Sequence, residues 1–349
     1  MATPAVAWSA DDTPLVSIII PNYNYADSLA VCLRAALNQT YPRTEVIVVD
    51  DASTDDSVAV AEALGVRVIR LATNGGCARS RNVGAAQARG DILFFVDSDL
   101  AMEPDAVAAA VAILRARPDV GAVCGLQDPE PLLHDTPVAR YRGVQYHYWS
   151  ASGEGEVTVL FPAMLAIPRR VFDEIGPFNE DLKQTEEVDY AYRLSRRYRI
   201  LLSREVRGRH DHDHALVPLL RKLFHRARLR IPLYLRARRF AKGFETAARA
   251  WASLAALAAV PALALPILFG PAWLVVSVAL LVASVLADRG MYAFARRHRG
   301  TRFLVFFTLM HYLVNVTITT GVAVGVLQWL WSRPFRGLYD RWFPQEVPG

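Results

Sequence analysis

The stretch ILFFVDSDL, residues 92–100, decides the fold of this chain. Its first part, Ile92 to Val96, is a short run of large apolar residues and is typical of a buried β-strand. Two carboxylates, Asp97 and Asp99, follow directly. Because a buried unpaired charge is costly, we expect a positive group to meet them.

This strand belongs to an alternation of strands and helices. The predicted strands are Leu15–Ile20, Glu45–Val49, Arg67–Leu71, Ile92–Val96 and Gly121–Gly125. The predicted helices between them are Asp27–Asn38, Asp55–Leu64, Cys77–Ala88 and Pro104–Arg117. Such alternation is typical of an α/β domain with a mostly parallel sheet and helices on both faces.

Polar residues follow three of the predicted strands, at the carboxyl ends where α/β sheets bind their ligands. They are Pro21, Asn22, Tyr23 and Asn24, then Asp50 and Asp51, then Asp97, Ser98 and Asp99. Tyr23 offers a face on which a nucleobase can stack. Asp50 or Asp51 can accept the N–H groups of a base or cap the next helix, and both roles can hold at once.

Asp97 and Asp99 form a D-x-D pattern, which predicts a divalent metal site. Carboxylates bind Mg²⁺ or Mn²⁺ and bridge these ions to phosphates. In RHDHDH, residues 209–214, one histidine, His210 or His212, is expected to add a ligand. The alternative is that these histidines are surface polar residues.

Two further segments carry candidate functional residues. In NGGCARSRN, Gly76 allows close backbone approach, and Arg79 and Arg81 are suited to phosphate oxygens, although at least one could lie on a solvated helix face. In QTEEVDY, the carboxylates of Glu186, Glu187 and Asp189 are candidates for the general base. Acidic residues at a helix N-terminus are the alternative reading.

For two further segments the sequence predicts structure. Residues 140–150, RYRGVQYHYWS, could line a cleft or pack on the sheet, and residues 168–199 read as helix, loop, helix.

Composition limits the function classes. The chain has 349 residues, of which 53% are hydrophobic, and a net charge of +5 with arginines concentrated from Arg193 onward. The three cysteines form no thiolate metal pattern, and no nucleic-acid-binding motif is present. A basic half next to apolar segments favours anionic membrane lipids as partners over nucleic acid.

The C-terminal half predicts attachment to a membrane. Residues 216–243 mix apolar residues with many arginines and predict a helix in the headgroup layer, with a basic soluble helix as the alternative. Residues 250–287 carry no charge and predict a helical hairpin that turns at Phe269–Pro271. Residues 303–331 predict a third span or a re-entrant element. The basic flanks indicate that the hairpin ends face the cytosol.

The motifs together resemble the family 2 glycosyltransferases of GT-A fold. The stretches SIIIPNYN, VIVVDDASTDDS, ARSRNVGAAQARGDILFFVDSD and GPFNEDLKQTEEVDYAYRL occur in the family's order, and the resemblance covers about residues 15–215. It implies inverting transfer of a sugar from a nucleotide-diphosphate donor. By position, Tyr23 and Asp51 would hold the base, Asp97 and Asp99 the ribose and the metal, and Glu187 stands where the family carries its aspartate base. There is no QxxRW motif, so a processive synthase is not expected.

We therefore expect a membrane-associated, non-processive glycosyltransferase that uses Mn²⁺ or Mg²⁺. The donor would be UDP- or GDP-linked, and the acceptor a polyprenyl phosphate, a polyprenyl-linked sugar or a glycerolipid. The expected location is the cytosolic face of the inner membrane, with several membrane passes. The alternatives are an inactive transferase-like scaffold, a transferase for a non-lipid polysaccharide, and a nucleotidyltransferase, for which no glycine-rich loop follows the first strand.

The expected organisation has five parts. These are a flexible tail (1–14), a GT-A domain (15–215), basic interfacial helices (216–249), transmembrane helices (250–332) and a C-terminal tail (333–349).

Overall fold

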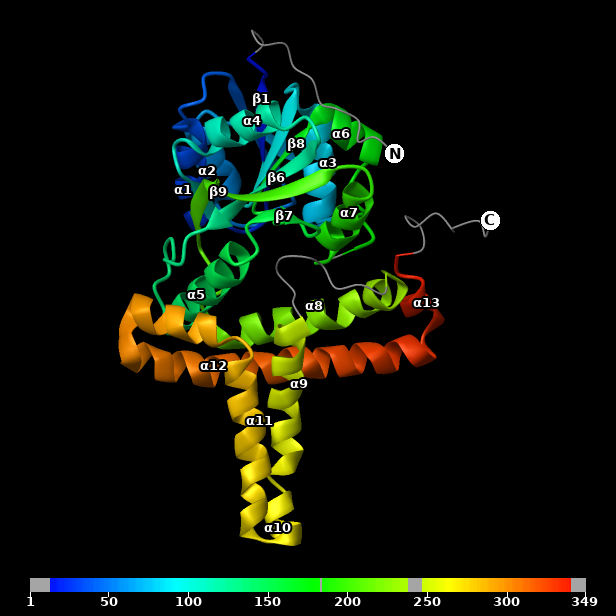
Figure 1. Ribbon diagram of the computed structural model, residues 1–349. Helices are drawn as coiled ribbons and strands as arrows, with labels where there is room; N and C mark the ends of the chain where they lie inside the picture. Colours follow the sequence, from blue (N-terminus) through cyan, green and yellow to red (C-terminus); the bar gives the residue numbers. More distant parts are fainter. Residues whose placement is uncertain (1–12, 183, 238–246, 340–349) are drawn as a thin grey trace. The chain divides into compact units, whose positions relative to one another are not determined.

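The computed structural model describes residues 13–182, 184–237 and 247–339 (Figure 1). They form two compact units, which divide between His212 and Asp213. Most of the two predicted tails, Lys183 and part of the predicted interfacial segment (238–246) lie outside the described residues.

The first unit is an α/β domain in which every predicted strand and helix is present. Its strands are β1 (Val16–Asn22), β2 (Thr44–Asp50), β3 (Arg67–Arg70), β4 (Ile92–Val96), β5 (Leu100–Met102), β6 (Val120–Gln127), β7 (Gly155–Val157), β8 (Met164–Pro168) and β9 (Arg199–His210). Its helices are α1 (Ala26–Leu37), α2 (Ser57–Ala63), α3 (Cys77–Gln87), α4 (Ala106–Ala116), α5 (Pro137–Ala151), α6 (Arg169–Ile175) and α7 (Glu186–Ser195). Helices α6 and α7 confirm the helix–loop–helix prediction, whereas β5, β7, β8 and β9 were not predicted.

The sheet is mixed, which corrects the prediction of a mostly parallel one. Its nine strands follow the order β3-β2-β1-β4-β8-β6-β9-β5, with β7 paired to β9. The pairs β3–β2, β2–β1 and β1–β4 are parallel, as expected from the helical crossovers. Strand β8 then enters antiparallel to both β4 and β6. Of the strands in this second half of the sheet, only β6 was predicted from the sequence.

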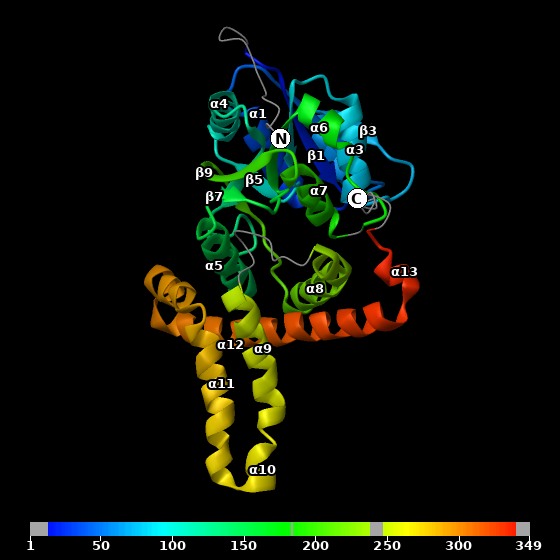
Figure 2. The ribbon, with the colours of Figure 1, turned by 45° about the vertical axis from the view of Figure 1, so that its right-hand side comes forward.

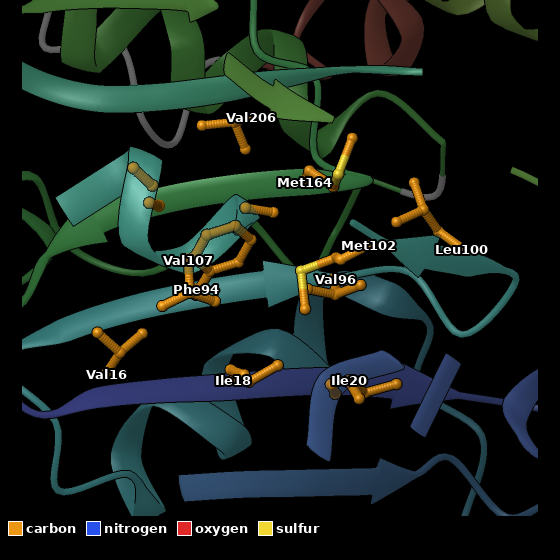
Figure 3. Packing of buried hydrophobic residues seen from close by; sticks show 14 of the residues in the cluster. Val16, Ile18, Ile20, Phe94, Val96, Leu100, Met102, Val107, Met164 and Val206 are labelled. Atoms are coloured by element: carbon orange, nitrogen blue, oxygen red, sulfur yellow. The ribbon is translucent and has the colours of Figure 1, made fainter. Parts of the chain in front are cut away.

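The two faces of the sheet are buried by alternate residues of each strand. Val16, Ile18 and Ile20 of β1 lie side by side next to Phe94 and Val96 of β4, and α1 and α4 cover them (Figure 3). Burying each such side chain stabilises the fold by about 1.5–3 kcal/mol.

The opposite face of the sheet is aromatic. The ring of Phe95 lies 5.9 Å from that of Phe172 and 5.5 Å from that of Phe178. Asp97 follows the last residue of β4 and comes two residues after Phe95. Because alternate residues of a strand share a face, the Asp97 side chain points to the aromatic face of the sheet. The side of the sheet on which Asp97 can find a partner is thus fixed by strand alternation.

Helix α5 covers the 140–150 segment, and the packing interpretation of this segment is confirmed for most of it. Tyr141, Val144 and Trp149 are buried. Two residues of α5 contact groups at or near the strand ends: the Tyr146 ring contacts those of His212 and Phe161, and Nδ1 of His147 lies 2.8 Å from the carbonyl oxygen of Gln127, the last residue of β6.

The second unit is helical. It contains α8 (Leu216–Ala237), α9 (Ala247–Ala262), α10 (Leu265–Phe269), η1 (Pro271–Trp273), α11 (Leu274–Leu286), α12 (Arg289–Trp331) and α13 (Arg333–Arg336). Helices α9 and α11 form the predicted hairpin, which turns through α10 and Gly270 (Figure 2).

Helix α12 is two helices that meet at a reversal. Gly300 has a φ of 83°, outside the helical range, and divides a basic arm from a longer apolar arm. The Tyr292 ring of the first arm contacts the rings of Phe307 and His311 in the second, each at 5.8 Å. The two arms therefore lie side by side. Of the described helices, α12 alone has the length and mean hydropathy of a membrane span.

Candidate active site

Two carboxylates and an imidazole meet at the carboxyl end of β4. One ligand atom from each of Asp97, Asp99 and His210 lies within 4.8 Å of the others. The pairing of β5 with β9 sets Leu100 opposite His210, which brings the Nε2 atom of His210 to 3.3 Å from Oδ1 of Asp99. We call these three residues the Asp–Asp–His cluster. Their side chains are 29%, 17% and 16% exposed, so a small ligand can reach them.

The chemistry of the Asp–Asp–His cluster fits a divalent cation. Two carboxylates supply hard oxygen ligands, and imidazole nitrogen is accepted by Mn²⁺. The remaining ring nitrogen of His210, Nδ1, is buried and makes no hydrogen bond to the described residues. The three residues come from two distant parts of the chain, β4 and β9, and the fold alone brings them together.

His212 does not join the Asp–Asp–His cluster. Its buried ring stacks on that of His210 at 4.6 Å between centroids and lies 5.8 Å from the ring of Tyr146. His212 therefore packs against His210, and Tyr146 of α5 packs against His212 in turn. Tyr146 is a residue of this site that the sequence reading did not single out, and its only signal was the aromatic composition of the 140–150 segment.

Arg81 is the positive group that Asp97 meets within the protein. Its two terminal nitrogens donate to Oδ1 of Asp97 at 2.9 Å and to Oε1 of Glu186 at 2.8 Å. The guanidinium lies 5.6 Å from the Phe178 ring and is nearly fully buried. Burial acts to lower the pKa of Arg81, but Asp97, Cys77 and Glu186 outweigh burial and raise it. Arg81 therefore remains charged and joins the Asp–Asp–His cluster to the start of α7.

Each terminal nitrogen of Arg81 bonds a carboxylate, and its side chain is only 3% exposed, so phosphate binding by Arg81 stays a prediction. Arg79, on the same helix, is only partly buried, and one of its terminal nitrogens lies 3.4 Å from the Thr73 hydroxyl. Of the two arginines, Arg79 is the more exposed.

The three acidic residues of α7 have different environments. Glu186 accepts from Arg81 and, through Oε2, from the Gln184 amide at 3.2 Å. Asp189 is fully buried and pairs with Arg193 at 3.0 Å. Burial raises the pKa of Asp189, and Arg193 opposes this shift.

Arg193 shows what the Asp189 pair does. Its other donors reach the carbonyls of Ile175 and Pro177, so the pair fixes the loop between α6 and α7. Glu187 stands where the resemblance places the family's base, and it stays the predicted candidate base. Glu187 is 7% exposed.

The first two strand ends form a second polar cluster. Asp51 accepts from the amides of Gly75 at 2.8 Å and Gly76 at 2.7 Å, so its carboxylate shapes the loop before α3. Gly76 has a φ of 88°, which favours glycine at this position. Asp50 accepts from the Ser53 amide at 3.0 Å, within the turn before α2. This is not a helix cap, because the N-cap of α2 is Asp56 and no side chain of the described residues caps that position.

Asn22 and Tyr23 complete this polar cluster. The Asn22 amide donates to Asp50 and Ser53, each at 3.2 Å, and its Oδ1 is buried without a hydrogen bond to the described residues. Tyr23 is 44% exposed and offers a stacking face, while Asn24 accepts from the Thr54 amide at 2.7 Å. The predicted positions Pro21 and Ser98 are buried beside these groups.

Comparison with known proteins identifies the class. The fold is that of a mannosyltransferase from Pyrobaculum calidifontis, PcManGT, whose structure was solved in complex with GDP-Man and Mn²⁺; the TM-score is 0.55 with 21% identity, covering 93% of this chain and 89% of that one. This likeness establishes a GT-A-like α/β domain. Residues 17–176 match the family model "Glycosyl transferase family 2". These residues are therefore a glycosyl transferase family 2 domain.

Sequence relatives agree with this assignment. An uncharacterized glycosyltransferase of Rickettsia prowazekii is 32% identical over 209 residues, or 56% of this chain and 63% of that protein. One from Haemophilus influenzae is 29% identical over 186 residues, 52% of this chain and 62% of that protein. The poly(ribitol-phosphate) beta-N-acetylglucosaminyltransferase TarS of Staphylococcus aureus is 37% identical over 105 residues, 28% of this chain and 18% of that protein. The chain thus spans less than two thirds of the length of these relatives.

Proposed function

We propose that the protein is an inverting, non-processive glycosyltransferase that moves one sugar from a nucleotide-diphosphate donor to a lipid or lipid-linked acceptor. The Asp–Asp–His cluster at the end of β4, within a family 2 domain, is the observation that carries this proposal. A UDP- or GDP-linked donor agrees with the GDP-Man and Mn²⁺ bound to PcManGT.

The residues of the first unit divide the work of the reaction. Asp97, Asp99 and His210 would hold Mn²⁺ or Mg²⁺, which supplies positive charge to the leaving diphosphate. The exposed Tyr23 and the polar groups around Asp51 would bind the base.

Glu187 would take the proton from the acceptor hydroxyl as that oxygen attacks the anomeric carbon from the face opposite the diphosphate. An acceptor that is itself a phosphate is already ionised, and it would depend less on Glu187.

The second unit supports a membrane-bound acceptor. Residues 250–287 carry no charge, and the hairpin exposes large apolar residues, with Ile267 86% and Leu268 69% exposed. Such a surface fits acyl chains, and the arginines of α8 fit anionic headgroups. We propose attachment to the cytosolic face of the inner membrane through several membrane-inserted helices. The acceptor would be a polyprenyl phosphate, a polyprenyl-linked sugar or a glycerolipid.

A polymer acceptor is the second candidate, because the relative TarS is named for transfer to poly(ribitol phosphate). The two candidates separate in one assay. Purified protein is incubated with a panel of UDP- and GDP-sugars, Mn²⁺, and either detergent-solubilised polyprenyl phosphate or a soluble glycan. Sugar transfer that requires the lipid supports the first candidate, and transfer to the glycan alone supports the second.

Asp99→Ala tests the site itself. We expect its turnover to fall about 10²–10³-fold, as when a group that stabilises transition-state charge is removed. Glu62→Ala is the control, because Glu62 is an exposed acid that pairs only with the exposed Arg70 among the described contacts. Unchanged turnover and metal dependence in Asp99→Ala would refute the assignment. Donor binding without any transfer in the wild type would instead indicate an inactive scaffold.

A further inference from the structure

We propose that α12 lies in the plane of the membrane together with α8, and that the α9–α11 hairpin is the element that enters the bilayer. This inference rests on the membrane attachment proposed above but not on the chemistry of the active site. It departs from the simplest interpretation of the sequence, since α12 alone among the described helices has the length and hydropathy of a span.

The first argument is that α12 is packed along α8. A Cβ atom added to Gly321 would lie 2.6 Å from the backbone oxygen of Phe224, and one added to Gly325 would lie 2.8 Å from that of Arg228. These glycines let the two helices approach closely over successive turns. Because of this packing, α8 must have the same orientation relative to the membrane as the apolar arm of α12.

The second argument is the charge of α8. Within four turns this helix carries five cationic side chains: Arg221, Lys222, Arg226, Arg228 and Arg230. If α12 crossed the bilayer, these charges would be carried into the hydrocarbon, where each is costly. In the headgroup layer the same side chains meet lipid phosphates and their stems cover apolar surface.

The third argument is that the hairpin crosses α12. The Ser253 hydroxyl near the start of α9 donates to Oδ1 of Asn315, in the middle of the long arm, at 2.9 Å. Both views show the hairpin running across this arm rather than along it (Figures 1 and 2). The hairpin and α12 therefore cannot both follow the membrane normal.

The hairpin is the better element to insert. It has no charged residue between Arg249 and Asp288, and these two residues close its base with an ion pair of 3.0 Å. Its tip exposes Ile267, Leu268 and Phe269, with no polar side chain to meet water. Basic residues follow the base directly: Arg289, Arg296, Arg297, Arg299 and Arg302. This order places the base among anionic headgroups and the tip in acyl chains.

The long arm of α12 fits an in-plane position. One stripe, which includes Phe307, Val314 and Gly321, is buried within the unit. The exposed residues Val305, Leu309 and Leu327 lie outside this stripe. An in-plane helix would rest these apolar side chains on the upper acyl chains while α8 faces the headgroups.

The test is the depth of spin labels in vesicles of mixed phosphatidylcholine and phosphatidylglycerol. Single cysteines are placed by Val305→Cys, Leu327→Cys and Ile267→Cys in a Cys77→Ser background, because Cys77 is exposed while Cys32 and Cys124 are buried. We expect the labels at 305 and 327 to lie at the same shallow depth and the label at 267 to lie deeper.

A spanning α12 would separate the labels at 305 and 327 by about 33 Å along the normal, at 1.5 Å per residue. Such a gradient, with the protein still floating with the vesicles, would overturn the in-plane arrangement and leave the proposed function standing. Failure to float with the vesicles would overturn both this inference and the membrane attachment on which it rests. A label at Glu62→Cys, on the exposed surface of the first unit, is the reference for a spin label that remains in water.

Discussion

Replacement of Arg81 by leucine tests the ion pairs that join Asp97 to Glu186 in the candidate active site. Arg81 holds Asp97 and Glu186 through separate nitrogens, at 2.9 and 2.8 Å, and is 2% exposed. Arg81→Leu removes the guanidinium and leaves both carboxylates without it. Removing one member of a buried ion pair costs about 3–5 kcal/mol.

We expect a loss near the lower end of that range, because the Asp97 side chain is 29% exposed and water can solvate it. For a unit of this size, about 3 kcal/mol lowers the melting temperature by about 6–12 °C. The double variant Arg81→Leu with Glu186→Leu should regain most of this loss, since well-packed apolar side chains can replace a buried pair.

The assay is thermal unfolding with and without Mn²⁺ and nucleotide diphosphate. Arg70→Leu is the matched control, since Arg70 and Glu62 form a pair at 2.6 Å with side chains 59% and 56% exposed. Such a surface pair contributes about 0–1 kcal/mol. Equal melting temperatures for Arg81→Leu and Arg70→Leu would refute the reasoning. Arg81→Lys should be intermediate, because one ammonium cannot reproduce both bonds of the guanidinium fork.

Three further predictions concern other parts of the structure. Glu187→Gln should lower turnover about 10²–10⁴-fold without changing the melting temperature, whereas Asp189→Asn should lower the melting temperature; the reverse pattern would contradict our choice of base. Hydrogen bonds from Ser17 and Arg89 outweigh burial and lower the pKa of Glu45 from 4.5, so its stabilisation is complete above that pH and is lost as the pH falls through the lower folded value. Glu45→Gln should therefore cost about 1–2 kcal/mol at neutral pH and nothing in strong acid, as measured by denaturant unfolding at both pH values. Gly321→Leu should separate α8 from α12 and cost about 1–3 kcal/mol, which proteolysis of the vesicle-bound protein would detect.

The parallel half of the sheet could be predicted because its strands are short apolar runs between clear helices. Strand β9 could not, because RILLSREVRGRH lacks the strict alternation of apolar and polar residues that marks a half-buried strand. Strand β8, MLAIP, is too short to be distinguished from a buried helical segment. Both strands depend on partners far away in the chain.

The candidate site was predicted in composition more than in geometry. The D-x-D pattern after β4 led to Asp97 and Asp99, and His210 was one of two histidines left open. The ion pair of Asp97 with Arg81 was not predicted, because Arg81 was assigned to phosphate by its chemistry alone. Strand alternation places Asp97 on the same face of the sheet as Phe95, where α3 and α7 pack. That Arg81 lies on this face within hydrogen-bond distance of Asp97 is visible only in the folded structure.

The pairing of β5 with β9 also matters for the chain while it is being made. Synthesis proceeds from the N-terminus, so Asp97 and Asp99 leave the ribosome long before His210. The Asp–Asp–His cluster is complete only after β9 has emerged and added itself to the sheet. The basic helix α8 begins six residues later, at Leu216, so a nascent chain completes the Asp–Asp–His cluster at almost the moment that it gains the first basic helix of the second unit.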